Sequence, residues 1–271
     1  MVIIGKNSNL THCVKKSYSK TASFSSQEIL ENVNILNQFR GVEFAVLFNN
    51  FQTAKYLSSV NNIEDYVNRS LTVTAKVLDH IKDFQNVKKI MYTSSSSVYG
   101  DNDYCNETDV PHPINLQASL KLANEFFIGQ YCRENKIDYT ILRVFNMFGG
   151  DDNFSIISKI IRAIKEKVEL TLVNDGAGIR DFIHIDDVVK VILKVLPIEN
   201  LPILNVGTGR GKSVKKILIY LESHNIFIQT KSIANDNEIR VSVANAYKVS
   251  EIIKKEFIAV EEYILNELNK G

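Results

Sequence analysis

Short runs of apolar and β-branched residues alternate along the chain with longer segments whose apolar positions recur every three or four residues. The short runs predict buried strands, and the longer segments predict amphipathic helices. Strands are expected at 1–4, 44–48, 88–94, 139–145 and 201–207, with helices at 63–84 and 116–135. Because strands that alternate with helices are typical of βαβ units, the predicted fold class is α/β, a Rossmann-like doubly wound parallel sheet.

The first half of this sheet is predicted to be shortened. Roughly 40 residues separate Gly5 from the strand end at 47–50. They leave room for one strand, such as 21–25, where a full Rossmann half usually holds two.

The pattern loosens after about residue 147, where a helix (154–167), a strand (170–173) and two more helices (185–196 and 213–224) are expected. Ser213 is placed as the N-cap of the last helix. We therefore expect an NAD(P)-binding Rossmann-like domain over residues 1–146. A smaller substrate-binding lobe over 147–271 is expected to be partly interleaved with it, and the cleft between them is the default ligand site.

Composition then narrows the class of protein. Of 271 residues, 45% are apolar and 23% are charged, as in ordinary soluble globular proteins. The 32 lysines and arginines nearly balance the 31 aspartates and glutamates, so we expect no nucleic-acid partner. No apolar run approaches the roughly 18 residues of a membrane span, and no leader-like segment begins the chain. A cytoplasmic protein without membrane association is expected, with a small molecule as its ligand.

The three cysteines add no chemistry to this picture. Cys13, Cys105 and Cys132 lie far apart, with no CxxC spacing and no histidine cluster beside them. This pattern predicts reduced thiols and no metal site.

The segment "GKNSNLT", from Gly5 to Thr11, follows the first predicted strand. A dinucleotide fold needs glycines there, because the backbone must approach a pyrophosphate that lies on the free N–H groups of the next helix. Only Gly5 is present, and Ser8 and Thr11 stand at the other glycine spacings. No acidic residue follows about 20 residues later to bind a ribose, so the choice between NAD and NADP stays open.

Several motifs occur together in a characteristic order. They are "IMYTSSSSVYG" (90–100), Lys121, "ILRVFNMFG" (141–149), "DGAGIRDFIHIDDVVK" (175–190), "LNVGTG" (204–209) and "NEIRVSVAN" (237–245). Together they resemble the extended short-chain dehydrogenase/reductase family, and within it the NAD-dependent epimerase/dehydratase group that acts on nucleotide sugars. The resemblance implies an oxidoreductase or epimerase that transfers hydride with a bound nicotinamide cofactor.

The resemblance also implies roles for individual residues. In the catalytic set, Ser95 hydrogen-bonds the reacting sugar oxygen, and Lys121 binds the nicotinamide ribose and lowers the pKa of the acid. The expected cofactor-binding residues are Gly5, Ser8, Leu10, Phe48, Asn50, Lys121 and Phe145. The expected substrate-binding residues are Ser96, Asn146 and Arg180, whose guanidinium suits a diphosphate.

Each motif also has a simpler explanation. Four serines after a strand can be a polar turn. Lys121 and Glu125 can be a surface pair at i,i+4 spacing, worth about 0.3–0.5 kcal/mol. Arg180 can be a salt-bridge residue beside Asp181.

Gln117 occupies the position at which the family carries a catalytic tyrosine, four residues before Lys121. A glutamine can orient a sugar oxygen but cannot exchange a proton near pH 7, and losing such a group costs roughly 10²–10⁴-fold in rate. A diphosphate-binding arginine expected before "DNEI" is Asn235 here. Substitute acids could be Tyr99, Tyr104 or His112.

Two functions remain open at this point. The first is a nucleotide-sugar 4-ketoreductase, epimerase or dehydratase in bacterial surface-polysaccharide biosynthesis. The second is a family member that binds a nucleotide or nucleotide sugar without turnover. Relatives commonly form dimers through a four-helix bundle, so a homodimer through 63–84 and 116–135 is possible.

Overall fold

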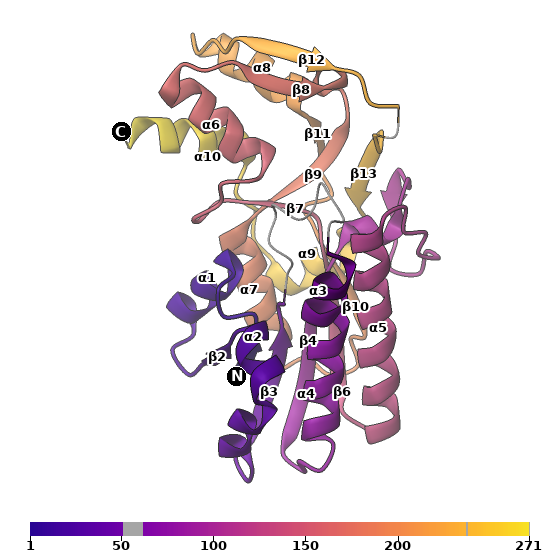
Figure 1. Cartoon of the computed structure of the whole chain (residues 1–271). Helices are drawn as coiled ribbons and strands as arrows, with labels where there is room; N and C mark the ends of the chain where they lie inside the picture. Colours follow the sequence, from indigo (N-terminus) through magenta and orange to yellow (C-terminus); the bar gives the residue numbers. More distant parts are fainter. Residues whose placement is uncertain (51–61, 237, 271) are drawn as a thin grey trace. The chain divides into compact units, whose positions relative to one another are not determined.

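The computed structural model describes residues 1–50, 62–236 and 238–270 (Figure 1). The chain divides into two compact units, which we describe separately. The first unit contains residues 1–98, 113–143 and 192–204, and the second contains 99–112, 144–191 and 205–271.

A six-stranded sheet with the order β10-β6-β4-β3-β1-β2 forms the centre of the first unit. Its strands are β1 (Val2–Ile4), β2 (Ala22–Phe24), β3 (Phe44–Phe48), β4 (Val87–Ser95), β6 (Asp138–Val144) and β10 (Ile203–Val206). Strand β1 pairs in parallel with β2 on one side, where Val2 faces Ala22, and with β3 on the other, where Val2 faces Val46. The order reverses at β1, and the carboxyl ends of β1 and β3 are therefore the point where such sheets bind ligands.

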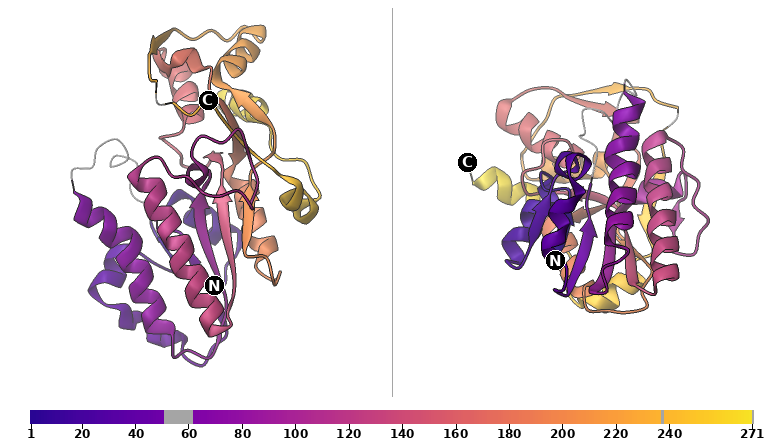
Figure 2. Two further views of the ribbon diagram at one scale, coloured as in Figure 1. Left: turned by 90° about the vertical axis from the view of Figure 1, so that its right-hand side faces the viewer. Right: turned by 60° about the horizontal axis from the view of Figure 1, so that its bottom comes forward.

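Helices cover the sheet because its central strands need burial on both faces, as in β3, which is apolar and buried throughout. They are α1 (Asn9–Ser17), α2 (Ser26–Glu31), the 3₁₀ segment η1 (Val33–Phe39), α3 (Ile63–Val67), α4 (Val73–Ile81) and α5 (Leu116–Asn135). Helices α4 and α5 run side by side (Figures 1 and 2). Val77 of α4 and Ile128 of α5 are fully buried in one cluster with Val46 and Ile90 of the sheet.

A single π-helical turn, η3 (Asn68–Thr72), joins α3 to α4 without interrupting the helical run. The sequence predicts one continuous helix over 63–84, so this turn is an addition to the prediction. Single π turns inserted in α-helices frequently occur at functional sites.

The second unit is built on short strands. Its five-stranded sheet consists of β5 (Tyr104–Cys105), β7 (Asn146–Phe148), β9 (Ile179–His184), β11 (Gly211–Ser213) and β13 (Val241–Ala244). A separate pair is formed by β8 (Leu170–Val173) and β12 (Thr230–Ile233). The helices are α6 (Ile156–Glu166), α8 (Val214–Ser223), α9 (Tyr247–Ile253) and α10 (Val260–Asn269), and α7 (Ile185–Val195) has residues in both units.

The predicted fold class is confirmed by the α/β architecture and its parallel central sheet. Between Gly5 and Phe44, all of which the structure describes, β2 is the only strand, so the first half is shortened as expected. Ser213 caps α8 by accepting a hydrogen bond from the Lys216 amide, as predicted. In the described part of the chain, no helix has the length and apolar character needed to cross a bilayer.

Candidate active site

The first turn lies at the reversal point of the sheet. Gly5 has φ of 119°, and a Cβ atom there would lie 2.1 Å from the carbonyl oxygen of Asn49, so only glycine fits. Ser8 caps α1 by accepting from the Thr11 amide. The side-chain amide of Asn49 donates to Ser8 Oγ (2.6 Å) and Thr11 Oγ1 (2.8 Å). The two residues at the other glycine spacings therefore fasten the turn to the end of β3.

The other residues expected along the cofactor differ in what they can offer. The side chains of Leu10 and Phe48 are fully buried, so these residues can contact a ligand only through their backbones. Asn50 is also buried, and its side-chain amide donates to the carbonyl oxygens of Arg69 and Ser70, both at 3.1 Å. Asn50 therefore binds the π turn.

The serine run at the end of β4 is more than a polar turn. Ser94 is buried and its hydroxyl donates to Glu125 Oε1. Ser95 is half-buried and its Oγ accepts from the Ser97 amide at 3.2 Å. Ser96 is half-buried as well. Ser94, the first serine of the run, is therefore held in the interior by Glu125, while Ser95 and Ser96 are partly accessible.

Lys121 and Glu125 are both buried, so the alternative of a surface pair is wrong. Lys121 Nζ donates to the carbonyl oxygen of Thr93 at 2.8 Å. Glu125 binds Arg143 through two donors, with 2.7 Å from the terminal nitrogen to Oε2. Burial lowers the pKa of Lys121 well below its usual value, and the charge of Glu125 partly opposes that shift.

A small polar pocket, here called the buried pocket, lies within the first unit. It brings three residues of the sequence prediction together, Gln117, Lys121 and Asn50. Its other lining residues were not predicted from the sequence; they are Tyr66, Ser70, Tyr92, Leu120 and Asn124. Asn124 could have been found from helical spacing, because it lies three residues after Lys121 on the same helix face.

The remaining predicted residues belong to the second unit. Asn146 Nδ2 donates to the carbonyl oxygen of Asp181 at 3.2 Å. The ring of Phe145 is buried, 6.5 Å from that of Tyr99 between centroids. Arg180 pairs with Glu238 at 3.1 Å, and burial lowers the pKa of this arginine while Glu238 opposes the shift.

The pairing of Arg180 refines the alternative of a salt bridge beside Asp181. Asp181 accepts hydrogen bonds from the amides of Thr208, Gly209 and Ala244, and its partners are therefore largely backbone groups. The acid that pairs with Arg180 is Glu238 instead.

The three substitute acids also lie in the second unit. The hydroxyl of Tyr99 donates to Asn205 Oδ1 at 2.7 Å, and this residue is buried. Tyr104 and His112 are exposed. None of them lines the buried pocket that contains Gln117.

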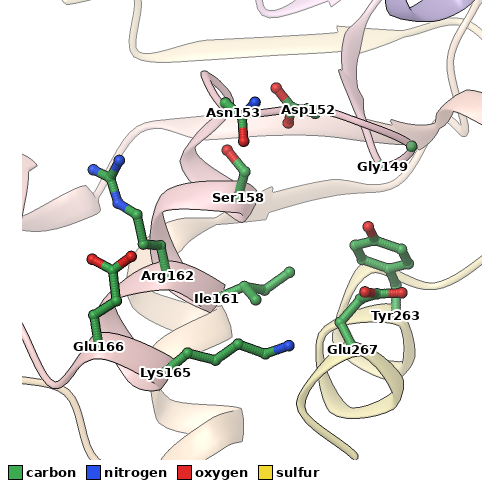
Figure 3. Close-up of a pocket in the computed structure, with 11 residues that line it drawn as sticks. Gly149, Asp152, Asn153, Ser158, Ile161, Arg162, Lys165, Glu166, Tyr263 and Glu267 are labelled. Atoms are coloured by element: carbon green, nitrogen blue, oxygen red, sulfur yellow. The ribbon is translucent and has the colours of Figure 1, made fainter. Parts of the chain in front are cut away.

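A second cavity of about 320 Å³, here called the α6–α10 pocket, lies within the second unit. In Figure 3, Ser158, Arg162 and Lys165 follow α6, and Tyr263 and Glu267 lie opposite on α10. Asp152 and Asn153 line it from the loop before α6, and Glu166 adds a third carboxylate. None of the site residues predicted from the sequence lines this pocket.

Comparisons with known proteins agree with the geometry. The chain matches the family described as "NAD dependent epimerase/dehydratase family" over residues 5–207. It is 28% identical to Protein CapI of Staphylococcus aureus over 187 residues, which cover 67% of this chain and 55% of that protein. It is 29% identical to UDP-glucuronate 4-epimerase of Thermodesulfobacterium geofontis, over 61% of this chain and 52% of that enzyme. The chain thus spans about half the length of these curated relatives.

Solved structures show the same fold. MoeE5 in complex with UDP-glucuronic acid and NAD superposes with a TM-score of 0.86 at 19% identity, covering 99% of this chain and 97% of that one. UDP-glucose 4-epimerase of Thermus thermophilus, in complex with NAD, gives 0.86 at 17% identity with the same coverage. The family match covers three quarters of the chain, and the chain belongs to the NAD dependent epimerase/dehydratase family.

Proposed function

We propose that this protein modifies a nucleotide sugar by NAD-dependent hydride transfer at a sugar carbon. The observation that carries the proposal is the position of Lys121, which is buried, donates to the carbonyl oxygen of Thr93 in β4 and lines a pocket with Gln117. NAD, when bound, supplies the acceptor and donor of hydride. The residues of this chain bind and orient the cofactor and the sugar, and they move protons.

The first unit fits the cofactor. Gly5 leaves room for close approach at the reversal point of the sheet, and α1 offers the free N–H groups of its first turn to a diphosphate. Lys121 binds the nicotinamide ribose, with Asn50 nearby in the same pocket. The family is described as NAD dependent, and NAD is accordingly our proposal over NADP.

The second unit supplies the substrate-binding residues in this proposal. Arg180 binds the substrate diphosphate, and Asn146 binds the sugar or diphosphate. Because Arg180 is paired with Glu238, a diphosphate must compete with that carboxylate. Ser95 and Ser96 contribute hydroxyls to the sugar from the first unit.

A second candidate function follows from Gln117. Its amide orients an oxygen but exchanges no proton, which favours a chain that binds a nucleotide sugar without turnover.

We extend the first proposal to a 4-ketoreductase, epimerase or dehydratase of bacterial surface-polysaccharide sugars in the cytoplasm. A homodimer through 63–84 and 116–135 is supported by Phe126 and Phe127 of α5, residues that are 65% and 49% exposed.

The test begins with the purified chain. Bound nucleotides are released and identified by mass spectrometry, and hydride transfer is then assayed with UDP-sugars and their 4-keto forms. We expect NAD to be bound and Gln117→Tyr to raise the rate about 10²-fold, the lower range for a general acid. Gln130→Tyr, at an exposed position of the same helix, is the matched control. Nucleotide binding without turnover in wild type and in Gln117→Tyr would favour the binding-only function.

A further inference from the structure

We infer that the buried pocket holds an ordered water, and that this water with Lys121 supplies the proton that a tyrosine at position 117 would otherwise supply. The inference rests on the proposed function for its chemistry. The water site itself rests on the structure alone.

Two buried acceptors point to the water. Among the described residues, Asn50 Oδ1 and Asn124 Oδ1 have no hydrogen-bond partner, although these residues are only 5% and 1% exposed. Both line the buried pocket. Leaving a buried amide oxygen unpaired costs about 1–3 kcal/mol, so native proteins normally satisfy such groups with protein or water.

The pocket has the size and polarity for one water. Its volume of about 10 Å³ lies at the lower end of what a single water needs. A buried water makes about three hydrogen bonds. Here the two amide oxygens can accept its hydrogens, and the Lys121 ammonium can donate to its oxygen, because all three residues line the same pocket.

The pocket leads outward to Gln117. In the described part of the chain, every lining residue is buried apart from Gln117, which is half-buried. Gln117, Lys121 and Asn124 follow one another at four- and three-residue spacing and therefore share one face of α5. The pocket that holds Lys121 and Asn124 therefore also borders the position of the missing phenol.

The proton steps balance for reduction of a keto sugar. Reduced NAD, when bound, would supply hydride to the carbonyl carbon, and the carbonyl oxygen then takes a proton from the water. The hydroxide that is left takes a proton from the Lys121 ammonium, and the neutral amine is protonated again from solvent. Oxidation of the hydroxyl runs through the same steps in reverse.

Lys121 suits this role because of its surroundings. Burial lowers its pKa well below the usual value, which makes its ammonium a better acid. The phenols of Tyr66 and Tyr92 lie in the same pocket, but burial raises the pKa of both. The structure therefore favours the lysine as the proton source.

The experiment replaces Asn124 with leucine, which keeps the volume but removes the acceptor. A crystal structure of the wild-type chain at about 1.5 Å should show water density between Asn50 and Asn124, and Asn124→Leu should lack it. Hydride transfer is expected to fall about 10-fold in Asn124→Leu and to lose a curved proton inventory in H₂O/D₂O mixtures. Asn135→Leu, at the exposed end of α5, should change neither. Asn124→Ser, which retains an oxygen, should recover both readouts and serves as the test if the leucine variant does not fold.

The double variant separates the inference from the proposed function. In a Gln117→Tyr background the phenol replaces the water, and Asn124→Leu should then have no effect on rate. Absence of water density in the wild-type pocket would overturn the inference, as would an unchanged rate and isotope effect in Asn124→Leu. Water density in a protein that transfers no hydride would instead overturn the proposed function and leave the water site standing.

Discussion

The buried pocket and the α6–α10 pocket differ in almost every respect. The α6–α10 pocket has a volume of about 320 Å³, and the buried pocket has about 10 Å³. In the larger one, Lys165 and Glu166 are exposed, so solvent and salt screen their charges. In the smaller one, Lys121 and the amides of Asn50 and Asn124 are buried from bulk solvent, and electrostatic interactions are stronger there. The comparison indicates that burial of polar groups marks the proposed reactive site better than volume does.

The largest difference is expected for a lysine in each pocket. Lys121→Met should lower hydride transfer by about 10²–10⁴-fold, because it removes the ammonium that binds the ribose and donates a proton. Lys165→Met, in the α6–α10 pocket, should leave the rate within about 2-fold, since this side chain has no part in the proposed chemistry. Steady-state kinetics of both variants with one 4-keto nucleotide sugar give the measurement. Equal losses would remove the distinction between the pockets.

Removing one glutamate near each pocket should change the free energy of unfolding by different amounts. Glu125→Ala should lower the free energy of unfolding by about 3–5 kcal/mol, because it leaves Arg143 as an uncompensated buried charge. Glu267→Ala removes a pair with the exposed Lys270 and should cost about 0–1 kcal/mol. Urea unfolding followed by circular dichroism measures both. A loss below about 1 kcal/mol in Glu125→Ala would contradict the expected cost of unpairing Arg143.

An asparagine in each pocket tests the same difference in stability, with smaller expected changes in the free energy of unfolding. Asn50→Ala should lower the free energy of unfolding by about 1–3 kcal/mol, since the π-turn carbonyls of Arg69 and Ser70 lose their donor. Asn153→Ala, at an exposed position of the α6–α10 pocket, should change it by less than about 0.5 kcal/mol. Thermal unfolding of the two variants is sufficient. Equal melting temperatures would show that Asn50 does not stabilise the turn.

The smallest expected effect is a pH dependence of stability. Burial lowers the pKa of Lys121 in the folded state. At pH values between that pKa and the usual lysine pKa of about 10.4, the unfolded state therefore binds more protons than the folded state. Stability contributed by this group therefore rises with pH across the window, by at most about 1.4 kcal/mol per pH unit, and has no slope below it. Urea unfolding of wild type and Lys121→Met at several pH values should show that the variant lacks this slope. If the free energy of unfolding of wild type, relative to that of Lys121→Met, fell as pH rises, the pKa of Lys121 would be raised by folding and the prediction would be wrong.

The sequence predicted local elements well and tertiary contacts poorly. Helix α5 has the predicted bounds, since its apolar spacing and the Asn115 cap are local features. The i,i+4 spacing of Lys121 and Glu125 left a surface pair open as an alternative, but Glu125 binds Arg143 of β6, a partner that only the fold supplies. The π turn is bound by Asn50, 20 residues away from Ser70, and no periodicity in the helix itself indicates it. The buried pocket was missed for the same reason, because Tyr92 and Asn124 meet only after β4 and α5 have packed.

Strand β10 has a consequence for how the chain is made on the ribosome. The outer neighbour of β6 is β10, and the amide of Ile141 donates to the carbonyl oxygen of Pro202. Strand β6 ends at Val144 and β10 begins at Ile203, so about 60 residues must be synthesised between them. At roughly 5–20 residues per second, the nascent sheet keeps one open edge for about 3–12 seconds. During that interval the edge of β6 is available to chaperones or to another nascent copy of the chain.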